Sequence, residues 1–109
     1  MQLPNHQDAL IADDKIRDYL LSDSHPVGRY KAAFFRALGY GPADWEGLAA
    51  DIRNLLIFEA EHLETSEFGD KYSVRGAIHG PSGRVEDIVT IRIILTDEDI
   101  PRFVTAYPA

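Results

Sequence analysis

Apolar and polar residues alternate with a period of two through the last third of the chain, a pattern typical of half-buried β-strands. The alternation occurs in three runs, at residues 71–79, 84–96 and 101–108. In the longest run, Val89, Ile91 and Ile93 alternate with Thr90 and Arg92. The three runs therefore predict a small antiparallel sheet with one apolar and one polar face.

The sequence Gly-Pro-Ser-Gly between the first two runs predicts a four-residue hairpin loop. A loop of this length places Val74 opposite Val89, so that apolar residues face each other across the strands. The four residues between the second and third runs fix the next pairing in the same way. The combined register predicts a row of Lys71, Arg92 and Thr105 across the sheet.

This register gives the sheet two different faces. The expected core face consists of Tyr72, Val74, Ile78, Val89, Ile91, Ile93, Leu95, Val104 and Ala106. The expected open face carries Lys71, Ser73, Arg75, His79, Thr90, Arg92, Thr105 and Tyr107. Because the open face is cationic and rich in hydroxyl groups, it is the first candidate for a functional site.

Helical patterns precede the strand runs. A short helix is expected from residue 13 or 14 to about residue 21, a second over about 27–38, and a third over about 42–62. In the third, Trp45, Leu48, Ile52 and Leu55 recur at spacings of three and four residues. The order of elements predicts an α+β fold, with about three N-terminal helices packed on one face of a C-terminal antiparallel sheet of three or more strands.

Composition places the chain among ordinary globular proteins. Its 109 residues predict a single domain over residues 1–109, with 45% hydrophobic and 27% charged residues. The absence of cysteine excludes disulfides, thiol catalysis and cysteine zinc sites. No apolar run approaches the roughly 18 residues of a membrane span, so we expect no membrane association and a cytoplasmic location.

The net charge of −7 argues at first against a nucleic-acid ligand. The charge is unevenly distributed, however. Residues 1–70 contain 6 Lys and Arg against 13 Asp and Glu, whereas residues 71–109 contain 5 of each. An acidic protein can still bind phosphate where its cations converge on one face.

The sequence contains no recognisable phosphate-binding loop, metalloprotease motif or hydrolase nucleophile motif. Glu59, Glu61, His62 and Glu64 are of types that bind metals, but on a helix only Glu59 and His62 have a suitable spacing. A solvated helix end explains this group better. We therefore expect no metal site and no cofactor.

His25 and Lys31 add candidate chemistry near the start of the second expected helix. An imidazole exchanges protons near neutral pH, which suits a general acid or base, although a polar turn residue is the simpler explanation of His25. Lys31 lies one helical turn inside, beside apolar residues, where a lysine usually extends outward. If Lys31 instead points at the open face, it adds a cation to Lys71, Arg75 and Arg92.

This combination suits RNA cleavage without a metal. The 2′-hydroxyl needs a general base, the phosphorane needs cations, and the 5′-oxygen needs an acid. The catalytic candidates are His25, Lys31, Arg92, Thr105 and Tyr107, and the substrate-binding candidates are Lys71, Ser73, Arg75 and Thr90. Solvated strand faces also carry such residues without any function, so the pattern alone leaves both interpretations open.

Four motifs resemble a family of bacterial domains of about this length. They are Leu-Pro-Asn at 3–5, Tyr-Leu-Leu at 19–21, His-Pro-Val-Gly-Arg-Tyr-Lys-Ala-Ala-Phe-Phe at 25–35, and Pro-Arg-Phe-Val-Thr-Ala-Tyr-Pro at 101–108. The family is similar to the barnase–EndoU–colicin–RelE group of metal-independent ribonucleases, found in bacterial toxin systems. The resemblance implies an antiparallel sheet after helices, with His25, Lys31, Thr105 and Tyr107 in the motif positions that match.

One strand departs from the family pattern. The strand before the last often reads Arg-Thr-Val-Trp in the family, whereas residues 89–92 here read Val-Thr-Ile-Arg. The first hypothesis is a toxin-type ribonuclease that binds RNA. The alternative is a non-catalytic module, such as an antitoxin, an immunity protein or a degenerate toxin-fold domain, which binds a cognate partner. The sequence does not determine the oligomeric state.

Overall fold

The computed structural model describes residues 3–5, 9–12, 15–16, 21, 28–55 and 58–109 of the chain. Its helices are α2 (Gly28–Ala37), the short 3₁₀-helix η3 (Pro42–Asp44) and α3 (Trp45–Asn54). Its strands are β1 (Ala60–Ser66), β2 (Gly69–His79), β3 (Val85–Leu95) and β4 (Arg102–Pro108). Helices precede strands in the described chain, so the fold is broadly α+β.

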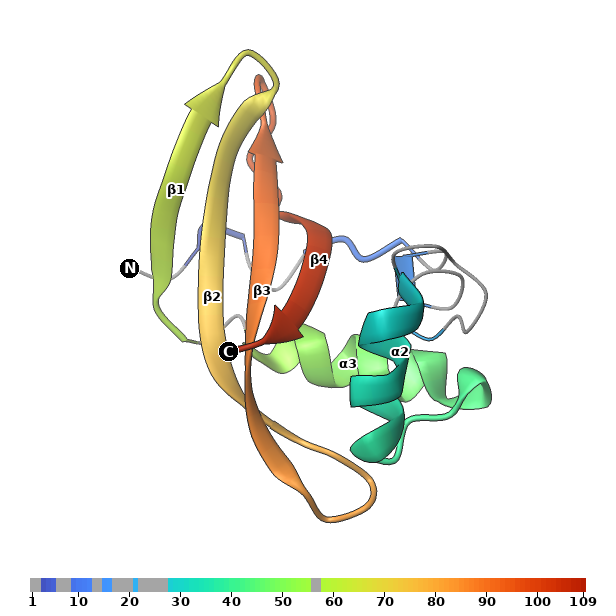
Figure 1. The fold of residues 1–109 in the computed structure, drawn as a ribbon. Helices are drawn as coiled ribbons and strands as arrows, with labels where there is room; N and C mark the ends of the chain where they lie inside the picture. Colours follow the sequence, from blue (N-terminus) through green and yellow to red (C-terminus); the bar gives the residue numbers. More distant parts are fainter. Residues whose placement is uncertain (1–2, 6–8, 13–14, 17–20, 22–27, 56–57) are drawn as a thin grey trace.

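The four strands form one antiparallel sheet in the order β1-β2-β3-β4. In Figure 1, α3 lies behind this sheet and α2 lies beside its β4 edge. The sheet therefore has a covered face, which packs against α3, and an open face, which is directed toward the viewer of Figure 1.

The prediction of about three N-terminal helices packed on one face of the sheet is wrong. The described residues contain two α-helices of 10 residues each, and α2 lies at the sheet edge rather than on its face (Figure 1). The third predicted helix ends at Asn54, and the chain from Ala60 onward forms β1. The helix predicted over residues 13–21 lies mostly outside the described residues. No described helix has the length and apolar character needed to cross a membrane.

Helical propensity explains the error at the end of α3. The sequence from Glu59 to Glu64 is rich in helix-forming residues, but the chain from Ala60 pairs with β2 as an edge strand. Strand pairing is a long-range interaction that a local pattern does not report. The turn at Ser66–Gly69 closes this hairpin, and a Cβ on Gly69 would lie 2.2 Å from the carbonyl oxygen of Ile94.

The core lies between α3 and the covered face. Leu48, Ile52 and Leu55 project from α3 at helical spacing and are buried, as their sequence pattern predicts. They belong to a cluster of Ile16, Leu21, Phe35, Leu38, Tyr40, Leu48, Ile52, Leu55, Ile78, Ile88, Phe103 and Ala106. Each fully buried aliphatic side chain of this size contributes about 1.5–3 kcal/mol to stability.

The predicted register of the β2–β3 hairpin is wrong by one residue. Val74 lies opposite Thr90 rather than Val89. Because side chains alternate along a strand, a slip of one residue exchanges the two faces of β3. Ile88, Thr90 and Arg92 are buried on the covered face, whereas Val89 and the residues alternating with it lie on the open face.

A contact with the end of α2 accompanies the longer hairpin loop. The backbone N–H of Gly80 donates to the carbonyl oxygen of Arg84 (2.8 Å), so five residues rather than four connect the strands. The N–H of Ser82 donates to the carbonyl oxygen of Leu38 (3.0 Å). A Cβ on Gly80 would lie 2.1 Å from the same Leu38 oxygen, so glycine permits the docking.

The pairing of β4 also differs from the prediction. Ile91 lies opposite Thr105 and Arg92 lies opposite Phe103, which leaves a bulge at Val104. The predicted row of Lys71, Arg92 and Thr105 is therefore absent. The bulge returns Phe103 to the covered face, where it is buried.

Candidate functional site

Three rows of paired residues cross the open face. The first row is Arg75, Val89 and Tyr107. The second is Glu61, Ser73, Ile91 and Thr105. The third is Glu64, Lys71, Ile93 and Arg102. Directly paired residues project from the same face of a sheet, so polar side chains of β1, β2 and β4 lie on either side of an apolar strip on β3.

Lys31 and Thr105 meet at the β4 edge of this face. Nζ of Lys31 donates a hydrogen bond of 2.7 Å to Oγ1 of Thr105, although 74 residues separate them in the sequence. α2 positions the lysine and β4 positions the threonine, and both residues are half-buried. An ammonium beside a hydroxyl provides adjacent donors for an anionic oxygen. The structure thus brings together two of the catalytic candidates named from the sequence, Lys31 and Thr105.

The open face also carries a groove, which reaches Tyr107 of the same strand as Thr105. Its volume is about 320 Å³, and its lining residues are Glu59, Glu61, Leu63, Ser73, Arg75, Val89 and Tyr107. We call it the open-face groove. Tyr107 has 39% of its surface exposed, so its ring is available for stacking. Three of the residues predicted from the sequence, Ser73, Arg75 and Tyr107, thus lie together.

Two cations of the open face form exposed ion pairs. Nζ of Lys71 lies 3.4 Å from Oε1 of Glu64, and Nη2 of Arg75 lies 3.2 Å from Oδ2 of Asp87. Exposed pairs of this kind are screened by water and contribute little to stability. Either cation can therefore turn to an anionic or acceptor group of a ligand at small cost.

Arg92 and Thr90 do not reach the open face, and the expectation that they lie there is wrong. Nη2 of Arg92 donates to the carbonyl oxygen of Ile52 (3.0 Å), and Nε donates to Oγ1 of Thr90 (3.3 Å). Its Cζ lies 5.1 Å from the centre of the Phe103 ring. Burial, together with the charge of Arg53, lowers the pKa of Arg92 to about 9.

The end of α3 explains why β3 turns an arginine inward. The helix dipole favours a cation beside the carbonyl groups of the last helical turn. Ile52 lies in that turn, and its carbonyl oxygen accepts from the N–H of Leu55 and also from Arg92, which brings the positive charge. Nη1 of Arg92 has no hydrogen-bond partner in the part of the chain that the structure describes.

No described histidine lies beside Lys31 and Thr105. His25 lies outside the described residues. Nε2 of His62 lies 3.0 Å from Oγ1 of Thr65 and 3.2 Å from Oδ1 of Asp70. Hydrogen bonds from Thr65 and His62 lower the pKa of Asp70. Among the described residues, no group of three or more His, Asp or Glu is arranged to hold a metal ion.

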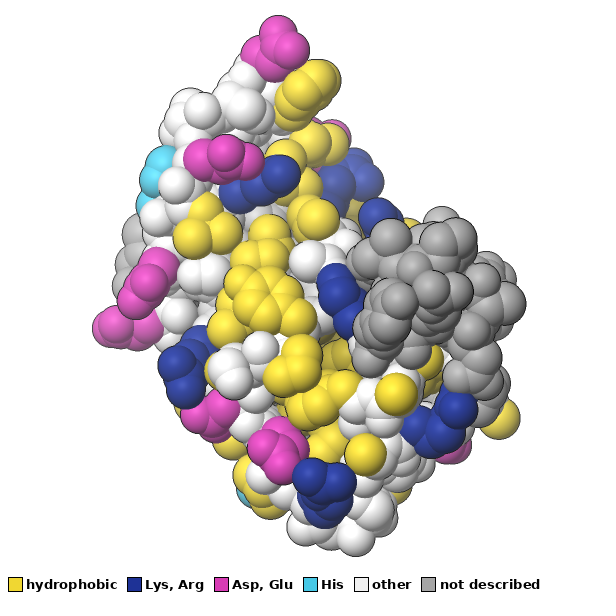
Figure 2. All heavy atoms as spheres, viewed as in Figure 1, with side chains coloured by type: hydrophobic (Ala, Val, Ile, Leu, Met, Phe, Trp, Pro, Cys, Tyr) yellow, Lys and Arg dark blue, Asp and Glu magenta, His cyan; other side chains and the backbone are white. Residues whose placement is uncertain are grey.

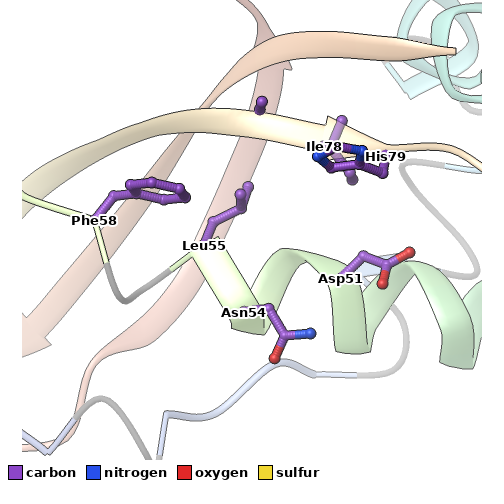
Figure 3. A pocket seen from close by; sticks show the side chains of 7 residues that line it. Asp51, Asn54, Leu55, Phe58, Ile78 and His79 are labelled. Carbon is purple, nitrogen blue, oxygen red and sulfur yellow. The ribbon is translucent and has the colours of Figure 1, made fainter.

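A second cavity lies between α3 and the end of β2, and Figure 3 shows its side chains. Its volume is about 250 Å³, and it is lined by Asp51, Asn54, Leu55, Phe58, Ala77, Ile78 and His79. The buried hydroxyl of Tyr40 donates to Oδ2 of Asp51. Burial, and then the bond to Asp51, raise the pKa of Tyr40 well above its usual value. His79 lines this second cavity, next to α3, and does not line the open-face groove.

An apolar band crosses the open face, and Figure 2 shows it between Lys and Arg side chains on either side. It consists of the half-buried Val89, Ile91, Ile93 and Leu95 with the exposed Leu63 and Tyr107. The band was not predicted from the sequence, because the same β3 residues were expected in the core. Two carboxylates of the groove, Glu59 and Glu61, were likewise missed because they were assigned to a helix end.

A family model for a domain of unknown function, DUF6883, matches residues 2–109. The chain belongs to this family. The match covers all four segments on which the sequence resemblance rests. The relation of DUF6883 to the ribonuclease group is a separate inference and stays a prediction. No protein of curated function matches the sequence.

This DUF6883 domain also shares its fold with a chain of the contact-dependent growth inhibition toxin–immunity protein complex from Klebsiella pneumoniae 342. The TM-score is 0.70 with 21% sequence identity, over 93% of this chain and 100% of that chain. At this level of identity the similarity shows the fold, which extends over nearly the whole DUF6883 domain.

Proposed function

We propose that this DUF6883 domain is a metal-independent ribonuclease of the toxin type. The observation that carries the proposal is the hydrogen bond of 2.7 Å between Lys31 and Thr105. It joins two distant segments at the edge of an open sheet face, beside an exposed tyrosine. A cation, a hydroxyl and an aromatic ring are the groups that single-stranded RNA requires for its phosphate and its bases.

The proposed reaction is an internal transfer of the phosphate. The 2′-oxygen of one nucleotide attacks the adjacent phosphorus, a 2′,3′-cyclic phosphate forms, and the bond to the 5′-oxygen breaks. The base removes a proton from the 2′-hydroxyl, and the acid returns one to the 5′-oxygen. Lys31 and Thr105 would donate to the non-bridging oxygens, on which negative charge accumulates in the transition state.

The remaining roles follow from position on the open face. Tyr107 would stack on a base next to the reacting phosphate, and Lys71 would bind a more distant phosphate along the third row. Ser73 and Arg75 would contact the substrate within the groove. His25 stays our candidate for the acid or base, since it immediately precedes the segment that carries Lys31. We leave Arg92 and Thr90 out of the proposed site because they are buried beneath the sheet.

The structural neighbour supports a role in conflict between bacteria. That neighbour comes from a toxin–immunity protein complex, and its fold covers nearly the whole of this chain. A toxin-type domain would also bind a cognate immunity protein, which must cover the reacting groups to neutralise them. We therefore propose such a protein as the partner of this chain.

Cleavage of a defined RNA tests the proposal. Purified protein should cut a 5′-labelled RNA in the presence of EDTA and leave a 2′,3′-cyclic phosphate on the upstream fragment. A matched RNA with a single 2′-deoxynucleotide at the cut position should resist cleavage there, because the attacking oxygen is missing. Cutting of the deoxy position, or complete inactivity of a folded protein on total RNA, would rule the proposal out.

The apolar band favours a second candidate function, a non-catalytic protein-binding module. Contiguous exposed apolar residues on a small protein often mark a binding surface, and Phe68 and Leu63 of the β1–β2 hairpin are 68% and 50% exposed. An immunity-type protein would use this surface and its acidic N-terminal part to cover a basic toxin. In that case the chain binds a purified toxin domain with a defined stoichiometry and leaves RNA uncut.

A further inference from the structure

The open face has a different electrostatic character at its β1 and β4 sides. Thr105, with Lys31 bonded to it, lies on the β4 side, and Glu61, which lines the open-face groove, lies three strands away in the row of Thr105. Ser73 and Ile91 occupy the positions between them. With a strand spacing of about 4.8 Å, Ser73 lies about 10 Å from Thr105 across the sheet. This is room for one nucleotide with its phosphate at the β4 side and its base at the β1 side.

The β1 side of the groove is unsuited to phosphate. Glu59 and Glu61 both line it, and neither side-chain carboxylate forms a hydrogen bond or ion pair within the described part of the chain. A phosphate there would be repelled by two carboxylates. Carboxylates accept hydrogen bonds and cannot donate them when ionised, so the ligand group they face must carry N–H or O–H donors.

Arg75 adds donors next to these acceptors. It lies on β2 opposite Val89, and it lines the groove together with both glutamates. Its pairing with Asp87 is exposed, so the guanidinium can turn to a ligand at small cost. The groove is therefore lined by the guanidinium donors of Arg75 and by carboxylate acceptors, together with the apolar side chain of Val89 and the ring of Tyr107.

We infer that the open-face groove is a binding subsite for guanine. The edge of guanine carries two acceptors, N7 and O6, followed by two donors, N1–H and N2–H. Arginine donates to O6 and N7, and a carboxylate accepts from N1–H and N2–H in the same bidentate geometry. Adenine, cytosine and uracil do not present two adjacent donors on this edge, so a carboxylate of the groove meets an acceptor in each of them.

This inference rests on the proposed function, because it identifies the base that lies beside the cleaved phosphate. Tyr107 would stack on that base while Lys31 and Thr105 hold its phosphate. A guanine in the groove then places the adjacent phosphodiester at the Lys31–Thr105 pair, so recognition of the base would select the cleavage position.

Binding of free nucleotides tests the subsite without requiring cleavage. The probes are 3′-GMP and 5′-GMP, each compared with the matching adenine, cytosine and uracil nucleotides by NMR titration or calorimetry. We expect at least one GMP to bind about tenfold more tightly than its counterparts, which corresponds to one bidentate base contact. Equal affinity for the four bases would overturn the inference.

Variants of exposed residues supply the specificity test. Glu61→Gln, and the double variant with Glu59→Gln, should reduce the guanine preference to within about twofold, while the affinity for AMP stays nearly unchanged. Glu64→Gln is the matched control, because Glu64 pairs with Lys71 outside the groove. A guanine preference that survives in the double variant would also overturn the inference.

Cleavage mapping separates failure of the subsite from failure of the proposed function. RNA cut at all four bases alike would leave the ribonuclease proposal intact and would reject the guanine subsite. A protein that binds GMP preferentially but cuts no RNA would support the subsite and reject the enzyme. Cuts that flank guanine, and that lose this selectivity in the Glu59 and Glu61 double variant, would support both.

Discussion

The guanidinium of Arg92 is bonded to the carbonyl oxygen of Ile52 at 3.0 Å, across 40 residues of sequence. This bond joins the centre of the sheet to the last turn of α3. It also fixes the orientation of β3, because the arginine and Thr90 must lie on the covered face while Val89 and Ile91 lie on the open face. Arg92 is therefore part of the core rather than of a phosphate-binding surface.

We predict that Arg92→Ala destabilises the protein by about 2–5 kcal/mol. The truncation leaves a cavity and removes the charged donor to the carbonyl oxygen of Ile52 and the donor to the buried hydroxyl of Thr90. Arg92→Met should cost less, since a side chain of similar length fills the space without a buried charge. Urea denaturation measures both values. A change below about 0.5 kcal/mol for the alanine variant would place Arg92 at the surface and contradict the register.

A pair of isoleucine variants tests the two faces directly. Ile52 is fully buried, so Ile52→Ala should cost about 2–5 kcal/mol. Ile91 is half-buried on the open face, and Ile91→Ala should cost about 1 kcal/mol or less, because the loss leaves no enclosed cavity. Equal costs in chemical denaturation would mean that Ile91 is part of a core.

Thr105→Val and Lys31→Ala should each reduce RNA cleavage by about 100- to 1000-fold, because each removes a donor to the transition state. Thr105→Val keeps the shape of the side chain, so its thermal midpoint should change little. Arg84→Ala is the control: it removes an exposed cation of the hairpin tip, which pairs with Glu86. Equal loss of activity in the control would point to a general effect of charge.

The Tyr40–Asp51 contact predicts a loss of stability at alkaline pH. Because the pKa of Tyr40 is raised in the folded protein, the stabilisation is complete below the ordinary tyrosine value of about 10 and decreases as pH rises above it. Tyr40→Phe should cost about 1–2 kcal/mol at neutral pH, since Asp51 loses a donor. The variant should also lose part of the alkaline slope in urea denaturation between pH 9 and 11. An unchanged slope would contradict the assignment.

Two glycine variants test the docking of the β2–β3 loop on α2. Gly80→Ala should destabilise the protein by several kcal/mol, because its Cβ would lie 2.1 Å from the Leu38 oxygen. Gly47→Ala is the control: nothing lies within 4 Å of a Cβ there, and the helix should gain about 0.5–1 kcal/mol. Thermal denaturation distinguishes the two. Similar midpoints for both variants would mean that the loop does not rest on Leu38.

Several local features could be predicted from the sequence. The helix over residues 28–37, the apolar spacing of Leu48 and Ile52, and the strands around Val74 and Ile91 all follow from hydrophobic periodicity. The sequence was sufficient for these features because the residues that determine each of them are close together in the chain.

The sequence by itself determined three of the four strands, β2, β3 and β4, and which side chains alternate along each of them. It did not determine which set of β3 side chains is buried, because both sets are compatible with a strand and a shift of one residue exchanges them. That choice depends on the five-residue loop that docks on Leu38, and on the hydrogen bond from Arg92 to the carbonyl oxygen of Ile52. Both are contacts between distant segments, so only the tertiary structure decided that Arg92 is buried and that the apolar band is open.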